Sequence, residues 1–232
     1  MKTLGLIGGM SWESTVPYYR TINEYVKNRL GGLHSAKIIL HSVDFHDIAQ
    51  LQEQGDWRQA ARLLSDIAIG LGKAGAQAIV ICTNTLHKAA DNIESASRLP
   101  LLHIADATGE SLFQQGMKKV GLLGTRYTME QDFYRRRIHE RYGIEVIIPD
   151  QAGRERVNRV IYEELCQGII DAGSRQSYRE IIRQLEQQGA EGIILGCTEI
   201  PLLLSSDDAD VPLFDTSFLH ATAAAKFSLS DK

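Results

Sequence analysis

Apolar residues along the chain follow two patterns that alternate from one end to the other. Short uninterrupted apolar runs are typical of buried parallel strands, and longer stretches with apolar residues at helical spacing are typical of amphipathic helices. The short runs are residues 3–9, 37–45, 78–82, 99–106, 119–124, 144–149, 192–197 and 211–215. The helical stretches are residues 13–30, 56–74, about 129–141, 155–170 and 175–188, and a further helix is expected after Asn84. Strands that alternate with helices predict an α/β fold with parallel sheets flanked by helices.

An internal repeat indicates how these elements are organised. KTLGLIGG (2–9) matches KKVGLLGT (118–125), GAQAIVICTNT (75–85) matches GAEGIILGCTE (189–199), and LPLLH (99–103) matches VPLFD (211–215). Three matches in the same order predict a duplication into two pseudo-symmetric lobes, each a parallel sheet flanked by helices, with an active site in the cleft between the lobes. We expect residues 1–113 plus 213–232 in the first lobe and residues 114–212 in the second.

Composition narrows the class of protein. The chain has 232 residues, enough to bury a sizeable core, and a net charge of −4. No basic run exceeds Arg135–Arg137, so nucleic acid and anionic membranes are poor default partners. No apolar run approaches the roughly 18 residues of a membrane span, and no signal-peptide pattern opens the chain. Three widely spaced cysteines do not form a disulfide framework, which favours a cytoplasmic protein with reduced thiols.

The repeat pairs a hydroxyl with a thiol. Thr83 follows Gly75 by eight residues and Cys197 follows Gly189 by eight, so Thr83, and not Cys82, is the mate of Cys197. Since neighbouring strand residues face opposite sides, Cys82 should point into the packing of the sheet. Ligands of α/β proteins collect at the carboxyl ends of strands, where helix N-termini suit carboxylates. Two such junctions facing each other could remove a proton from one side of a carbon and return one to the other side.

The segments CTNTLH, GCTEI and LIGGMSWES resemble the aspartate/glutamate racemase family, and most closely its branch of L-aspartate/glutamate-specific racemases. The resemblance implies a cofactor-independent enzyme with one catalytic cysteine in each lobe, no metal, and a homodimeric state. Carried over, the second cysteine is Cys197, while the first position falls on Thr83. The substrate-binding residues would be Met10, Gln52, Asn84, Thr85, Thr198 and Glu199. Gln52 falls where the family has an arginine, and Cys166 falls where it has a lysine, which puts the identity of the substrate in doubt.

The exchange of cysteine for threonine changes the expected chemistry. A thiol with a pKa near 8.5 reaches the thiolate at neutral pH for roughly 2 kcal/mol, whereas an alkoxide costs on the order of 12 kcal/mol. We therefore expect Cys197 to abstract the α-proton from L-Asp or L-Glu and Thr83 to reprotonate the opposite face. Two other functions stay open: a related isomerase or decarboxylase of dicarboxylates, and a non-catalytic amino-acid-binding protein.

Each candidate residue also has a purely structural interpretation. Cys197 could be an inert buried thiol, and Met10 a core residue. Thr83, Asn84, Thr85 and Thr198 could cap helices, and Glu199 could be an acid that complements a helix dipole. His87 and Cys166 are more typical of structural helix residues. Gly8–Gly9 lacks the remainder of a nucleotide-binding motif, and no cluster has the spacing of metal ligands.

Overall fold

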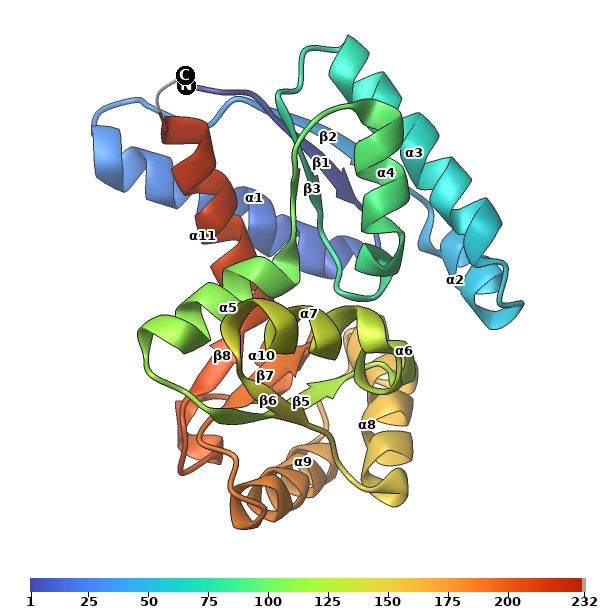
Figure 1. Ribbon diagram of the computed structural model, residues 1–232, viewed down its shortest axis with the longest axis vertical. Helices are drawn as coiled ribbons and strands as arrows, with labels where there is room; N and C mark the ends of the chain where they lie inside the picture. Colours follow the sequence, from blue (N-terminus) through green and yellow to red (C-terminus); the bar gives the residue numbers. More distant parts are fainter. Residues whose placement is uncertain (231–232) are drawn as a thin grey trace. The chain divides into compact units, whose positions relative to one another are not determined.

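The computed structural model describes residues 1–230, within which the strands form two four-stranded parallel sheets flanked by helices (Figure 1). The first sheet has the order β2-β1-β3-β4 and the second the order β6-β5-β7-β8. The expected α/β class with two parallel sheets is therefore confirmed. In the first sheet the strands are β1 (Leu4–Gly8), β2 (Ile38–Ser42), β3 (Ala78–Ile81) and β4 (Leu101–Leu102). In the second they are β5 (Lys119–Gly124), β6 (Glu145–Ile147), β7 (Ile193–Gly196) and β8 (Leu213–Asp215).

Helices connect the strands in both halves of the chain. Those of the first half are α1 (Trp12–Leu30), α2 (Phe45–Glu53), α3 (Trp57–Lys73), the 3-10 helix η1 (Thr85–Ala89), α4 (Ala90–Ser97) and α5 (Ile104–Gln114). Those of the second half are α6 (Arg126–Glu130), α7 (Asp132–Tyr142), α8 (Gln151–Glu163), η2 (Leu165–Gln167), α9 (Ala172–Gln187), α10 (Ile200–Leu203), η3 (Ser206–Asp208) and α11 (Thr216–Leu229).

Alternate residues of the first sheet point to opposite faces and belong to two separate hydrophobic cores. Ile7, Ile79 and Ile81 pack with α2, α3 and α4 on one face. Leu6, Val80 and Cys82 pack on the other face, against buried residues of α1 and α11. The period of two along β3 thus places Cys82 in the sheet–helix packing, as the sequence predicts.

Strand registers repeat from one sheet to the other. Gly5 lies opposite Ile79 in the first sheet, and Gly121 lies opposite Ile193 in the second. Ile79 is in turn paired with Leu101, and Ile193 with Leu213. These are the pairs that the sequence repeat equates, so the duplication extends to individual hydrogen-bonded positions. By the same register Thr83 is equivalent to Cys197.

Contacts between residues divide the chain into two compact units, Met1–His103 with the segment from His220 onward, and Ile104–Leu219. The boundaries differ from the expected ones by about ten residues, because α5 packs against α7 and β8 pairs with β7. Each unit therefore contains a helix that follows, in sequence, the last strand of the other unit's sheet. The second unit contains α5, which follows β4, and the first contains most of α11, which follows β8.

Two strand expectations were too long. Residues 37–45 were expected to be one strand, but β2 ends at Ser42 and α2 begins at Phe45. The cause is Asp44, whose carboxylate accepts a hydrogen bond from the backbone N–H of His46 at 3.0 Å and caps the helix. Residues 104–106 were likewise expected in a strand but open α5.

Candidate functional site

Three loops of the first unit leave the carboxyl edge of its sheet. β1 and β3 are adjacent and parallel, with Ile7 opposite Ile81, so the segments that follow them emerge together. Met10 lies on the segment after β1, and Thr83, Asn84 and Thr85 lie on the segment after β3. Gln52 lies on α2, which follows β2. The sheet thus carries the five predicted site residues of this unit on the loops and helix that follow three neighbouring strands.

Thr83 is half-buried and opens the turn into η1. Its N–H donates to the carbonyl of Ile81 at 2.9 Å. Its own carbonyl accepts a hydrogen bond from Nδ1 of His87 at 2.7 Å. Both backbone polar groups of Thr83 are therefore hydrogen-bonded, which fixes the backbone from which its side chain projects.

The other first-unit candidates are largely buried. Asn84 and Thr85 are buried at the start of η1, and Gln52 is buried on α2. Met10 packs in the hydrophobic cluster that contains Ile7 and Ile48, so it has the contacts of a core residue. The remaining thiol, Cys82, is fully buried, and burial raises its pKa so far that it stays protonated.

In the second unit the three predicted residues form one hydrogen-bonded group. Cys197 follows the last residue of β7, and Glu199 precedes α10. The Cys197 thiol donates to Oε2 of Glu199 at 3.0 Å, and the Thr198 hydroxyl donates to the same oxygen at 2.9 Å. All three side chains are buried. The sequence named Glu199 as a substrate-binding residue; the structure adds a direct bond to the thiol.

Electrostatics keep the Cys197 thiol protonated at rest. Burial raises its pKa well above the ordinary value, and the negative charge of Glu199 raises it further. Cys166 on η2 contributes in the same direction. A thiol in this state can become a base only if its proton has somewhere to go, and Oε2 of Glu199 is the acceptor already in place.

Two tyrosines near Cys197 were missed by the sequence analysis. Burial raises the pKa of Tyr162 and of Tyr178, and a thiolate at Cys197 would raise both further. Tyr162 lies on α8 and Tyr178 on α9, where the hydroxyl of Tyr178 donates to the carbonyl of Val157 at 3.1 Å. Neither residue belongs to a sequence motif. Their proximity to Cys197 depends on how α8 and α9 pack, which the sequence pattern does not specify.

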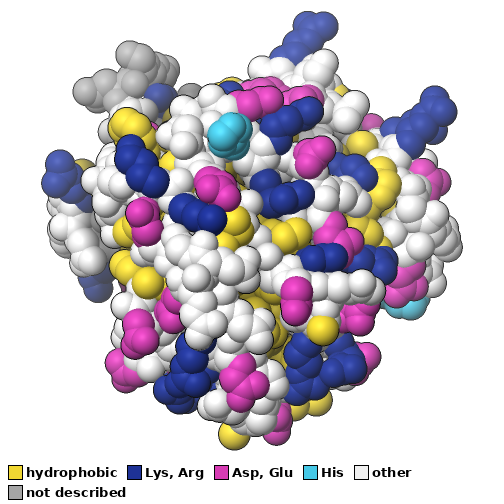
Figure 2. Space-filling model, turned by 60° about the horizontal axis from the view of Figure 1, so that its bottom comes forward, with side chains coloured by type: hydrophobic (Ala, Val, Ile, Leu, Met, Phe, Trp, Pro, Cys, Tyr) yellow, Lys and Arg dark blue, Asp and Glu magenta, His cyan; other side chains and the backbone are white. Residues whose placement is uncertain are grey.

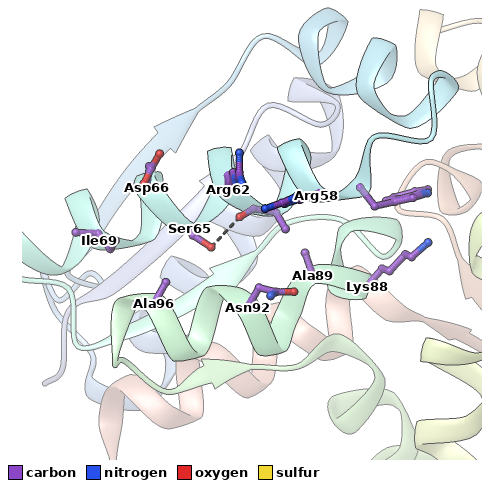
Figure 3. A pocket seen from close by; sticks show the side chains of 11 residues that line it. Arg58, Arg62, Ser65, Asp66, Ile69, Lys88, Ala89, Asn92 and Ala96 are labelled. Carbon is purple, nitrogen blue, oxygen red and sulfur yellow. Dashed lines mark hydrogen bonds between the residues drawn. The ribbon is translucent and has the colours of Figure 1, made fainter.

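A groove of about 750 Å³ between α3 and α4 lies apart from these residues (Figure 3). It is lined by Arg58, Arg62 and Ser65 on one side and by Asn92 on the other. The Ser65 hydroxyl donates to the carbonyl of Ala61 at 2.7 Å. None of the sequence-predicted site residues lines this groove, so it is not part of the candidate site.

Basic and acidic side chains are interspersed over the face drawn in Figure 2. No helix within residues 1–230 combines the length and apolar character that crossing a membrane requires. In the same part of the chain, no three His, Cys, Asp or Glu side chains are arranged to hold a metal ion.

Comparisons with known proteins agree with the two-sheet architecture. The profile of the Asp/Glu/hydantoin racemases matches residues 7–224. A crystal structure from Yersinia pestis, described provisionally as an Asp/Glu racemase, is 66% identical with a TM-score of 0.93, over 99% of this chain and 100% of that chain. An aspartate racemase homologue from Pyrococcus horikoshii OT3 is 34% identical with a TM-score of 0.85, over 99% and 100% of the two chains. The broad-specificity amino-acid racemase of Bacillus subtilis is 24% identical over 92% of both chains. The chain belongs to the Asp/Glu/hydantoin racemase family.

Proposed function

We propose that the protein is a cofactor-independent racemase of acidic amino acids, L-Asp and L-Glu, in which Cys197 and Thr83 serve opposite faces of the α-carbon. The observation that carries the proposal is the hydrogen bond from the Cys197 thiol to Glu199, at the carboxyl end of β7. The register equivalence of Cys197 and Thr83 supports the assignment of the second group.

On the L side, Cys197 removes the α-proton. The thiol proton passes to Oε2 of Glu199, the Cα–H bond breaks, and its proton forms a new S–H bond while the electron pair stays on the α-carbon. Delocalisation of the electron pair into the adjacent carboxylate stabilises the carbanion. Glu199 then returns its proton to solvent.

On the other side, Thr83 acts as a proton donor. Its O–H bond breaks as a new Cα–H bond forms, and a proton from solvent restores the hydroxyl. The reverse reaction requires Thr83 to act as a base, directly or through water, which costs on the order of 10 kcal/mol more than for a thiol. Because L and D enantiomers have equal free energy in water, kcat/KM for net racemisation must be equal in both directions. Hydrogen exchange, in contrast, can be much faster from L than from D, and we expect weak net racemisation.

The substrate is the part of the proposal that rests on the resemblance. Gln52 stands where the family has an arginine, which weakens the grip on a side-chain carboxylate. The B. subtilis relative is described as a broad-specificity racemase, so neutral amino acids belong in any substrate panel. A homodimer and a cytoplasmic location stay predictions.

Proton NMR in D₂O tests the proposal by following α-hydrogen wash-out separately from L-Asp, D-Asp, L-Glu and D-Glu. We expect wash-out from the L enantiomers that is lost in Cys197→Ser. Equal wash-out from both enantiomers would contradict an acid-only Thr83. If none of the four exchanges, maleate and malonate analogues and neutral amino acids are tried next. Binding without exchange would favour an amino-acid-binding protein.

A further inference from the structure

Three buried histidines of the first unit gather behind Thr83. The ring centroid of His87 lies 4.6 Å from that of His103 and 5.4 Å from that of His220. All three side chains are buried, on η1, just after β4 and on α11. The hydroxyl of Tyr18 on α1 lies 2.9 Å from Nδ1 of His220. Three helices, η1, α1 and α11, and the residue after β4 thus bring imidazole and phenol groups to one place.

The hydrogen bonds define the tautomers of two of these rings. A carbonyl oxygen only accepts, so the ring nitrogen that faces it must carry the hydrogen. Nδ1 of His87 therefore donates to the carbonyl of Thr83 at 2.7 Å. Nε2 of His220 donates to the carbonyl of Leu102 at 2.7 Å, and Nδ1 of a neutral His220 accepts from Tyr18.

The cluster favours the neutral form of His87. Burial lowers the pKa of His87 well below its ordinary value, and a proton on His103 or His220 would lower it further by repulsion. These two histidines are the titratable groups that face His87, and Tyr18 faces His220. His87 thus remains a neutral donor to Thr83 at neutral pH.

The internal duplication provides a built-in comparison. At the positions equivalent to His87, His103 and His220, the second unit has Pro201, Asp215 and Thr108. Tyr134, the equivalent of Tyr18, donates instead to the Thr108 hydroxyl at 3.2 Å. The same fold is therefore built around Cys197 without an imidazole at any of these three positions. The three histidines accompany the threonine and have no counterpart on the side of the thiol.

We propose that His87, packed against His103 and His220, is a positioning residue for Thr83 through its hydrogen bond to the Thr83 carbonyl. A hydroxyl that donates a proton to a carbanion must be closely aligned with it. Holding the carbonyl of Thr83 fixes the backbone from which its hydroxyl projects. This inference rests on the role proposed above for Thr83.

The test compares net racemisation with L-side wash-out in the same protein. Net racemisation, measured by chiral chromatography, needs both faces, whereas wash-out from L needs Cys197 alone, so their ratio reports on Thr83. We expect His87→Phe to lower this ratio roughly 10-fold or more, since small misplacements of reacting groups have effects of that size. His87→Asn places an amide N–H near the position of Nδ1–H, and it should restore the ratio to within about threefold of the native value.

Thr83→Val separates failure of this inference from failure of the proposed function. If Thr83→Val leaves the ratio unchanged, Thr83 is not the donor and both fail. If Thr83→Val lowers the ratio and His87→Phe does not, only the role of His87 is overturned. Nitrogen-15 NMR of the native protein adds a readout that needs no variant: His87 should be the Nδ1–H tautomer and His220 the Nε2–H tautomer. A His87 ring protonated only on Nε2 would also overturn it.

Discussion

Glu199 receives two hydrogen bonds on one oxygen, from the thiol of Cys197 and the hydroxyl of Thr198. If this carboxylate takes the thiol proton, an amide in its place cannot, although its oxygen can still accept both hydrogen bonds. We therefore expect Glu199→Gln to slow α-hydrogen wash-out from the L substrate by about 100-fold with little change in thermal stability. Wash-out in D₂O and thermal unfolding measure the two effects. Glu163→Gln, at an exposed position of α8, is the matched control; equal rates in the two variants would contradict the role of Glu199.

Thr83 offers the complementary change. In Thr83→Cys the group at this position becomes a thiol, for which the thiolate costs roughly 2 kcal/mol instead of the 12 kcal/mol of an alkoxide. We expect wash-out from the D enantiomer to rise by at least about 100-fold relative to wash-out from L. Cys82→Ala is the control, since Cys82 is fully buried in the sheet packing and should not affect the ratio. A Thr83→Cys variant with an unchanged ratio would show that residue 83 does not face the D side.

For single residues, the repeat in the sequence predicted which positions are equivalent, but it did not predict the hydrogen bonds between side chains. Counting from Gly75 and Gly189 equates Thr83 with Cys197, and the strand registers agree. The bond between Cys197 and Glu199 depends on the turn between β7 and α10, which brings residues i and i+2 together. Spacing alone does not specify that turn, so the sequence identified Glu199 as near the site but not as a partner of the thiol.

Among the secondary-structure elements, β7 shows why the thiol of the second half stands at 197 and not at 196. Gly196 occupies the position equivalent to Cys82, where a Cβ would lie 2.6 Å from Cδ1 of Leu122 and 2.9 Å from the carbonyl oxygen of Leu123. The oxygen belongs to the backbone of the neighbouring strand β5, so it cannot easily move away. A side chain at 196 would therefore push β7 from β5 and displace Cys197.

We expect Gly196→Ala to lower the free energy of unfolding by about 1–3 kcal/mol, the usual effect of overpacking. Gly70→Ala is the control: Gly70 lies inside α3, where a Cβ would meet no atom of residues 1–230 outside the helix backbone within 4 Å, and alanine there should stabilise by roughly 0.5–1 kcal/mol. Urea denaturation of both variants gives the two values. A Gly196→Ala variant as stable as the native protein would mean that β7 and β5 can separate freely at this point.

The hydrophobic pattern predicted the first residues of helices less well than the helices and strands themselves. The sequence continued the strands expected at 37–45 and 99–106 through residues that in fact open α2 and α5. Asp44 carries a capping signal that a run of apolar neighbours concealed. The helix α11 was not expected at all, because its sequence is rich in small residues and lacks a clear polar face. Such a helix is explained by burial: Ala221, Ala224 and Ala225 pack directly on the first sheet.

For the whole molecule, the sequence predicted the duplication and placed residues 213–232, which contain α11, with the first lobe, but it did not predict that α5 belongs to the second unit. Contacts group α5 with the second unit and most of α11 with the first. Sequence similarity shows which segments are equivalent; it does not show which sheet a helix covers. One consequence is that His220 reaches the cluster around His87 from the far end of the chain.

That cluster makes stability depend on pH. The ordinary pKa of a histidine is 6.5, and burial together with His103 and His220 holds the pKa of His87 well below it. As pH falls below about 6.5 the unfolded chain takes up a proton at His87 that the folded protein does not, so the free energy of unfolding decreases by up to about 1.4 kcal/mol per pH unit for this one ring. His87→Asn cannot take up that proton, and its stability should fall less steeply between pH 7 and pH 5. Urea denaturation at a series of pH values measures both slopes, with His34→Asn, at an exposed position, as the control. If His87→Asn and the native protein lose stability in parallel, His87 is protonated in the folded state as readily as in the unfolded chain.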